Sequence, residues 1–343
     1  MSVALHQARG PRALDAKAAL ILQSDYWRRL PGQKEWSHFC VLGRELTLIA
    51  NLSLAPARVV ALARVAGLGW LGAVESVERG ALELRGGSID ARFGASALRF
   101  RDGAYQLELA TRDGSLAARL ELRPRLRPAL TSSIPLARAA TMKWFVVPRL
   151  EASGHVCVRE RSFALERAPA YHDHDWGPFR WGGDFSWEWA VVLPEGDAAE
   201  WSFVFQRISD RARHRTLSQG LLAWRKGGHA LTLHGRELSL RSEGLLRQRR
   251  ALVVPGVMRL VGGAGATDAP RRLELRAERG ADVVELALEL EDLARIAVPN
   301  DGEEPGATLV CEAHARARVS GRLRGARIDC EAAALVELNR APA

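Results

Sequence analysis

The feature that most constrains this chain is the alternation of apolar and polar residues along most of its length. The segment "ALRFRDGAYQLELATRDGSLAARLELRPRL", residues 97–126, alternates in this way and is interrupted by Asp102-Gly103 and Asp113-Gly114. Alternation with a period of two is typical of half-buried strands, and Asp-Gly between such strands favours a tight hairpin turn. The same style returns in the second half of the chain. We therefore expect an all-β protein of many short antiparallel strands, arranged as sandwiches or barrels.

Helical periodicity occurs in two places only, residues 12–23 and residues 55–66, and predicts a short helix at each. A weak internal repeat indicates duplication. Glu35-Trp36 and Glu188-Trp189 each open an apolar β-run after a turn-rich stretch. At 343 residues the chain is long enough for two domains of ordinary size. We predict two consecutive β-domains, residues 1–178 and 179–343.

The net charge of +9 raises the question of an anionic partner. Only four of the 49 basic residues are lysines, and the arginines are spread along the predicted strands rather than gathered in a basic helix or arm. This pattern indicates solvated strand faces and excludes a nucleic-acid partner. We also expect no obligate protein partner. Weak attraction to an anionic membrane surface is left open.

The sequence shows neither a secretory signal nor an apolar run long enough to span a membrane, so we expect a cytoplasmic protein, at most peripheral to the membrane. The four cysteines lack the spacing of a metal site or redox motif. They are expected to be reduced, mostly buried thiols. Cys311 and Cys330 are spaced so that they could face each other across a hairpin.

One segment, residues 168–193, departs from the plain composition of the rest. Its sequence, "APAYHDHDWGPFRWGGDFSWEWAVVL", holds two histidines, three aspartates, a glutamate and four tryptophans. If its first part is a strand, alternate side chains lie on opposite faces. The two faces then carry His172, His174 and Trp176 on one side, and Tyr171, Asp173 and Asp175 on the other.

A metal site is the first hypothesis for this segment. A His-x-His pattern on a strand points two imidazoles the same way, which is a common start to zinc or iron coordination. Further ligands would have to come from His38, Asp184, Glu188 or His214. Nothing in the sequence selects among them, and indole walls suit a hydrated ion poorly. We therefore predict no metal.

An acid–base site in an aromatic pocket is the second hypothesis. A carboxylic acid held among indoles is desolvated, so its pKa rises and it can exchange protons near neutral pH. Indole faces also stabilise a nearby cation. Together these groups suit protonation of an apolar alkene, which leaves a carbocation. In the third hypothesis the same residues only close the end of a barrel, and His–Asp pairs satisfy each other's hydrogen bonds.

The stretch "MKWFVVPRLEASGHVCVRERSFALERAPAYHDHDWG", Met142 to Gly177, resembles the lipocalin-like hydroxyneurosporene synthase (carotenoid 1,2-hydratase) family. Members of that family carry a Pro-Arg-Leu strand, a Gly with a short apolar run, and a Tyr-His-Asp-His-Asn-Trp-Gly-like motif. The segment "GQKEWSHFCVLG", residues 32–43, is similar to the family's opening segment near a cavity. Asp175 stands where the family usually has asparagine, which adds an acid.

The resemblance implies two consecutive calycin-like (lipocalin-like) barrels with a hydrophobic cavity, and addition of water to an isoprenoid double bond without a cofactor. His172, Asp173, His174, Trp176 and Gly177 match the motif. Hydratases of the family also use an acid on a following strand, but no acid lies between residues 200 and 210 here. This departure weakens the hydratase implication and leaves the fold implication intact.

Our leading hypothesis is a hydratase (a lyase) that acts on an apolar isoprenoid or polyene substrate. Asp173, assisted by His174, would protonate the alkene while Trp176 and Trp189 face the cation. Asp173 and His174 share a face only if a bulge intervenes, and otherwise Glu188 or Asp184 is the candidate acid. The alternatives are a cyclase or pericyclase, and a carrier of a hydrophobic ligand. The residues expected to bind substrate are Trp36, His38, Tyr171, His172, Asp175, Trp181, Trp187, Glu188 and Trp189.

Overall fold

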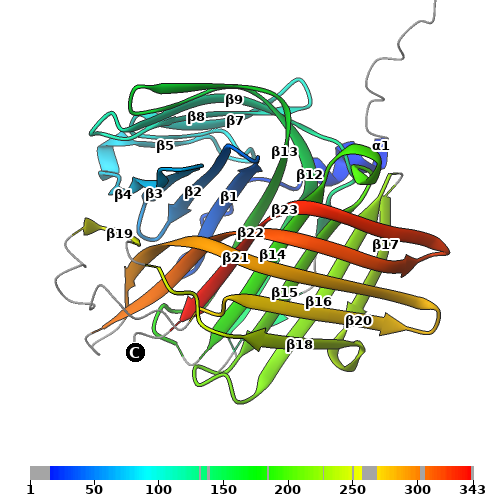
Figure 1. Cartoon of the computed structure of the whole chain (residues 1–343). Coiled ribbons are helices and arrows are strands. Elements are labelled where there is room, and N and C mark those ends of the chain that lie inside the picture. Colours follow the sequence, from blue (N-terminus) through cyan, green and yellow to red (C-terminus); the bar gives the residue numbers. More distant parts are fainter. Residues whose placement is uncertain are drawn as a thin grey trace, which may run out of the picture.

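The structure is a computed structural model that describes residues 16–130, 133–136, 140–183, 185–226, 228–248, 251–256, 269–301 and 306–340. A short helix precedes two large antiparallel sheets (Figure 1). The elements of the first half are α1 Ala16–Leu22, β1 Lys34–Leu42, β2 Leu46–Leu54, β3 Arg58–Val65, β4 Gly69–Ser76, η1 Arg79–Ala81, β5 Leu82–Leu84, β6 Ala91–Phe93, β7 Ser96–Arg101, β8 Ala104–Ala110, β9 Leu116–Pro124, β10 Ala129–Leu130, β11 Ile134–Pro135, β12 Thr141–Val158 and β13 Arg161–Gly177.

The second half repeats this style without a described α-helix. Its elements are β14 Ser186–Pro194, η2 Gly196–Ala198, β15 Ser202–Ser209, β16 Thr216–Arg225, β17 Gly228–His234, η3 Gly235–Glu237, β18 Leu238–Glu243, β19 Leu252–Val254, β20 Arg272–Arg279, β21 Asp282–Pro299, β22 Ala307–Leu323 and β23 Ala326–Arg340.

The two sheets have the same connectivity. In each, a four-stranded meander (β1 to β4, then β14 to β17) begins with a strand that pairs with the last strand of its own sheet, β13 or β23. Figure 1 shows the first sheet curled above the second. The ladders are antiparallel except where β19 joins β21. The predicted all-β, lipocalin-like architecture is confirmed.

The chain crosses from one sheet to the other between residues 177 and 186. The predicted domain limit at residue 178 falls in this crossing and stays a prediction.

Three apolar cores hold the molecule together, one inside each curled sheet and a third between the sheets. Strand β1 shows how they meet. Phe39 and Val41 point into the core of the first sheet, whereas Cys40 and Leu42 point into the core between the sheets. A strand at this junction is therefore buried on both faces, and its polar side chains Glu35, Ser37 and His38 are buried with it.

The predicted Asp-Gly turns are present. Arg101 and Ala104 are paired across a two-residue loop in which both Asp102 and Gly103 have positive φ, 52° and 73°. This is the backbone that a tight hairpin requires.

Two other sequence expectations need correction. Residues 58–65 form strand β3 rather than a helix, because most of this strand is buried on both faces, so its apolar run lacks the strict alternation that marks a strand. Cys311 pairs in register with Leu338, and Cys330 with Val319, so the two cysteines do not face each other. All four cysteines are free thiols. The helix predicted for residues 12–23 is seen as α1; residues 12–15 lie outside the described residues.

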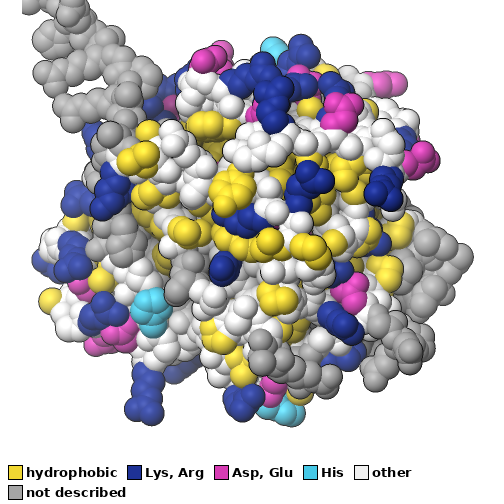
Figure 2. All heavy atoms as spheres, turned by 180° about the vertical axis from the view of Figure 1, so that it is seen from behind, with side chains coloured by type: hydrophobic (Ala, Val, Ile, Leu, Met, Phe, Trp, Pro, Cys, Tyr) yellow, Lys and Arg dark blue, Asp and Glu magenta, His cyan; other side chains and the backbone are white. Residues whose placement is uncertain are grey.

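Charge is dispersed over the surface. On the face seen in Figure 2, Lys and Arg side chains are scattered among acidic ones, and hydrophobic side chains form a band across the middle. Among the described residues no helix is long and apolar enough to cross a membrane.

Gly177, at the end of β13, is required by a close backbone contact. A Cβ at this position would lie 2.1 Å from the carbonyl oxygen of Thr141 on β12. We expect Gly177→Ala to lower the free energy of unfolding by about 1–3 kcal/mol, because the two strands must move apart. Urea unfolding measures this. Gly80→Ala is the control, because a Cβ there meets no atom within 4 Å, and a loss of equal size in both variants would contradict the steric explanation.

Candidate active site

The side chains of β13 alternate as the sequence predicts. The ladder between β13 and β1 runs without a break from Ala170 to Gly177. The bulge that would bring Asp173 and His174 onto one face is therefore not present, and the two side chains point to opposite sides of the sheet. Tyr171, Asp173 and Asp175 face the space between the two sheets, whereas His172, His174 and Trp176 face the interior of the first sheet.

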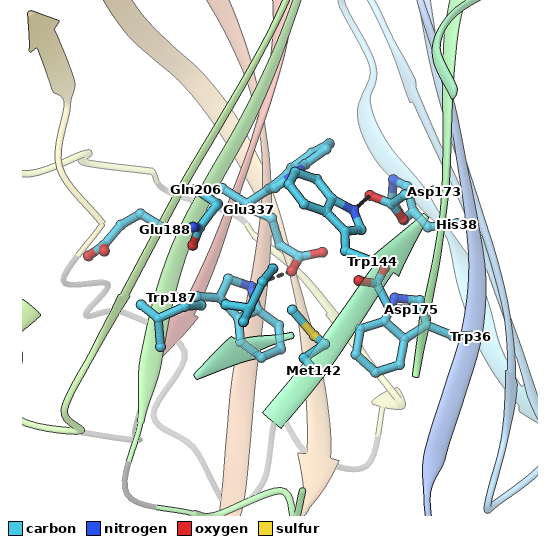
Figure 3. A pocket seen from close by; sticks show the side chains of 13 residues that line it. Trp36, His38, Met142, Trp144, Asp173, Asp175, Trp187, Glu188, Gln206 and Glu337 are labelled. Carbon is cyan, nitrogen blue, oxygen red and sulfur yellow. Dashed lines mark hydrogen bonds between the residues drawn. The ribbon is translucent and has the colours of Figure 1, made fainter. Parts of the chain in front are cut away.

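A cavity of about 490 Å³, including open solvent at its mouth, lies between the sheets. Its walls come from β1, β11, β12 and β13 of the first sheet and from β14, β15 and β23 of the second. Figure 3 shows the carboxylates of Asp173, Asp175 and Glu337 pointing toward one another across it. The residues that line it are Trp36, His38, Ile134, Met142, Trp144, Asp173, Asp175, Trp187, Glu188, Trp189, Gln206, Ile208 and Glu337.

Asp173 and Asp175 form a buried carboxyl pair. Asp173 accepts hydrogen bonds from the Tyr171 hydroxyl at 2.7 Å and from Trp144 Nε1 at 3.1 Å. Burial, followed by the charge of Asp173 and the hydrogen bond to it, raises the pKa of Asp175 well above its usual range, although a hydrogen bond with Trp36 opposes this. Two like charges this close cannot both stay ionised, so Asp175 holds a proton and Asp173 accepts hydrogen bonds. Asp175 is thus a neutral acid facing the cavity.

A second carboxyl pair lies on the opposite wall. Glu312 on β22 and Glu337 on β23 are paired in register and hydrogen bonded to each other. Trp187 Nε1 donates to Glu337 Oε1 at 2.5 Å. Burial raises the pKa of Glu337 to about 7, against the lowering effect of the hydrogen bonds with Glu312 and Trp187. Burial, and then the charge of Glu337, raises the pKa of Glu312 well above its usual range.

Indole rings form much of the remaining wall. Trp189 lies between Tyr171, at 5.2 Å between ring centroids, and His38, at 5.8 Å. Its Nε1 is buried and has no hydrogen-bond partner in the part of the chain that the structure describes. Burial lowers the pKa of His38, although the charge of Asp173 opposes this, so His38 is a neutral imidazole. The cavity therefore combines neutral acid, neutral base and aromatic faces.

A second cavity adjoins the first. It has a volume of about 760 Å³, including open solvent, and shares Trp36, Trp187 and Glu337 with it. Trp181 lines this second cavity, with its ring 5.5 Å from that of Trp187. Glu337 therefore stands where the two cavities meet, and the second cavity is lined by apolar residues together with Lys34, Arg58 and Glu312.

The opposite face of β13 holds a closed polar network. Asp25, in the loop after α1, contacts His172 Nε2 at 2.9 Å and His174 Nδ1 at 2.7 Å. His174 Nε2 contacts Glu35 at 3.0 Å, and His172 Nδ1 contacts the His38 carbonyl oxygen at 2.8 Å. Every imidazole nitrogen of the two histidines is thus occupied, which leaves none for a metal ion.

The predicted site residues are therefore divided among the first cavity, the second cavity and the histidine face of β13. Glu188 is paired with Arg207 at 2.8 Å, and its carboxylate points away from the cavity in Figure 3. Trp176 packs against Arg28, whose guanidinium carbon lies 3.4 Å from the centroid of the Trp176 ring. Asp184 lies outside the described residues. The predicted residues that line the first cavity are Trp36, His38, Asp173, Asp175, Trp187, Glu188 and Trp189. The catalytic roles of His174 and Trp176 stay predictions, on a face that the cavity does not reach.

Sequence reasoning missed Asp25, Glu312 and Glu337. Each is brought to β1 or β13 from a distant part of the chain. One signal was present for the two glutamates, since each is an isolated acid within an apolar β-run, "LVCEAHA" and "AALVELN".

Comparison with solved structures shows which proteins share this architecture. A Nitrosomonas europaea protein with the provisional name AttH superposes with a TM-score of 0.64 at 13% identity, covering 96% of this chain and 97% of that one. Kievitone hydratase from Nectria haematococca superposes with a TM-score of 0.59 at 12% identity, covering 90% and 88%. The chain shares its fold with a hydratase. CghA in complex with Sch210972 superposes with a TM-score of 0.53 at 12% identity, covering 90% of this chain and 88% of that one. No family model and no curated protein sequence matches the chain.

Proposed function

We propose that this protein is an enzyme that adds water to a carbon–carbon double bond of an apolar isoprenoid or polyene substrate. The observation that carries the proposal is the buried Asp173–Asp175 pair, a neutral acid beside a hydrogen-bonded carboxylate, facing a cavity walled by indoles. The fold shared with kievitone hydratase supports it.

The chemistry uses only groups that face the cavity. Asp175 transfers its proton to one alkene carbon, so its O–H bond breaks as a C–H bond forms and a carbocation remains. The faces of Trp36 and Trp189 stabilise that cation. A water molecule adds to the cationic carbon and returns a proton to the Asp175 carboxylate, which restores the acid. Asp173, held by Tyr171 and Trp144, keeps Asp175 protonated between turnovers.

The test is incubation of the purified protein with acyclic polyene and polyprenyl substrates in ¹⁸O-labelled water, with products analysed by mass spectrometry. A product that gains one labelled water supports hydration. Unchanged mass with a new retention time would replace hydration by cyclisation. Ligand bound and recovered unchanged would replace both by a carrier.

Trp189 offers a prediction that separates catalysis from simple binding. Its Nε1 has no hydrogen-bond partner among the residues described, so changing the ring breaks none of the hydrogen bonds of the described structure. We expect Trp189→Leu to lower kcat about 30-fold, which corresponds to about 2 kcal/mol of cation–aromatic stabilisation in a dry site. Trp189→Phe keeps a weaker aromatic face, so its kcat should lie between those of the wild type and Trp189→Leu. Equal kcat in the two variants, with a change in KM alone, would mean that the ring only fills space.

A further inference from the structure

Three potential metal ligands lie together at the centre of the molecule, outside the Asp173–Asp175 pair. One ring nitrogen of His38 and one carboxylate oxygen each of Glu312 and Glu337 lie within 4.8 Å of one another. They come from β1, β22 and β23, so both sheets contribute. This set is distinct from the His-x-His pattern of the sequence, whose nitrogens are all engaged.

Two of the three ligand residues, His38 and Glu312, are buried and each keeps one polar atom without a partner among the described residues, whereas Glu337 is half-buried and accepts a hydrogen bond from Trp187. His38 is 3% exposed and Glu312 is 2% exposed. His38 Nε2 and Glu312 Oε2 have no hydrogen-bond partner among the described residues. A buried polar atom that lacks a partner costs free energy, so two of them in one cluster indicate a ligand.

The surrounding charge favours a cation. Asp173 on the facing wall adds a further carboxylate, whose charge acts on both Glu312 and Glu337. The described residues that line the first cavity include neither lysine nor arginine. The second cavity is lined by Arg58 and by Lys34, which is paired with Asp301 at 2.8 Å, so carboxyl groups outnumber cationic side chains around the three ligands.

We propose that His38, Glu312 and Glu337 bind one divalent first-row transition ion at the junction of the two cavities. An imidazole nitrogen with two carboxylates suits zinc or manganese, whereas magnesium prefers oxygen ligands and water. Metal–ligand bonds of about 2.0–2.2 Å place two donors at most about 4.4 Å apart, so side-chain shifts of about half an ångström close the site. Three protein ligands leave coordination positions open. Glu337 lines both cavities, so these positions are within reach of a cavity ligand.

The test uses chelator-treated full-length protein titrated calorimetrically with Zn²⁺ and with Mn²⁺, and with Co²⁺ as a spectroscopic probe of nitrogen ligation. We expect one equivalent to bind with micromolar or tighter affinity and to raise the melting temperature. His38→Gln and Glu312→Gln should each weaken metal binding by at least about 10- to 100-fold. Loss of an outer-sphere partner alone has an effect of that size, and these two residues are direct ligands.

His314→Gln is the matched control. His314 is a buried histidine on β22, two positions beyond Glu312, but its Nδ1 contacts the Thr47 hydroxyl at 2.9 Å, away from the three ligands. It should bind metal like the wild type. Absence of one-equivalent binding by the wild type would overturn the proposal, as would undiminished affinity in both ligand variants.

Should a ligand variant fail to fold, anomalous diffraction at the zinc edge from the wild type decides instead. A peak among the three donors supports the site, and a peak elsewhere, or none, overturns it. Product formation by chelator-treated protein is measured separately, so a failure of the metal site and a failure of the hydration proposal are distinguishable.

Discussion

Asp175→Asn is expected to lower kcat for water addition by about 10²- to 10⁴-fold, the range that a general acid contributes. Asparagine keeps the size of the side chain and a hydrogen-bond donor toward Asp173, but it has no proton to give to carbon. The cavity walls are unchanged, so KM should stay within a few-fold of the wild-type value. Steady-state kinetics on the hydrated product measures both parameters.

Two companion variants make this result specific. Asp173→Asn should also slow the reaction, because it removes the carboxylate that keeps Asp175 protonated, and its pH profile should shift relative to the wild type. Asp197→Asn alters an exposed acid in η2 and should leave kcat unchanged. If Asp175→Asn kept wild-type kcat, the proton would have to come from another group, and the role assigned to the pair would be wrong.

Local pattern was enough to predict most of the fold. Alternation located the strands, and Asp102-Gly103 located a hairpin turn with the two positive φ angles that it needs. The same rule failed at residues 58–65, because strand β3 is buried on both faces over most of its length and its apolar run matches neither template well. A strand alternates strictly only when one of its faces is buried, and both faces of β3 are buried over most of its length.

Local alternation likewise placed some of the site residues but not others. Alternation along β13 correctly placed Asp173 and Asp175 on one face and His172 and His174 on the other, so His174 lies on the opposite face from Asp173, the acid that it was predicted to assist. Long-range pairing then decided what each face meets. Glu337 reaches the cavity because β23 pairs with β14, and nothing local to residue 337 encodes that pairing. The sequence thus indicated lining residues on β1, β13 and β14, but not Glu337 on β23.

Asp25 carries the second large effect that we expect, on stability. It is buried and contacts both His172 and His174, and it accepts a hydrogen bond from the Tyr105 hydroxyl at 2.7 Å. Asp25→Asn leaves the two histidines without their shared carboxylate inside the first sheet. Removing one member of a buried ionic network costs about 3–5 kcal/mol, so the free energy of unfolding should fall by about that amount.

The dependence on pH follows from two opposite shifts. Burial alone would raise the pKa of Asp25, but the charges and hydrogen bonds of His172 and His174 outweigh it and hold that pKa well below its usual 3.8. The stabilisation from Asp25 is therefore full above about pH 4 and is lost as the pH falls further. Burial alone would lower the pKa of His174, but its hydrogen bonds to Asp25 and Glu35 raise it above 6.5. That contribution is full below pH 6.5 and is lost as the pH rises through the raised value.

Urea unfolding followed by circular dichroism between pH 3 and pH 9 tests both statements. The wild type should lose stability toward either end of this range, and Asp25→Asn should show a flatter profile at a lower level. Asp329→Asn removes an exposed ion pair with Arg318 and should cost no more than about 1 kcal/mol. The same series decides what the histidine face does. A network that only holds the first sheet together predicts that His174→Gln unfolds at lower urea, while the protein that remains folded keeps wild-type kcat. Loss of kcat at unchanged stability would instead make His174 catalytic, as the sequence motif alone predicts.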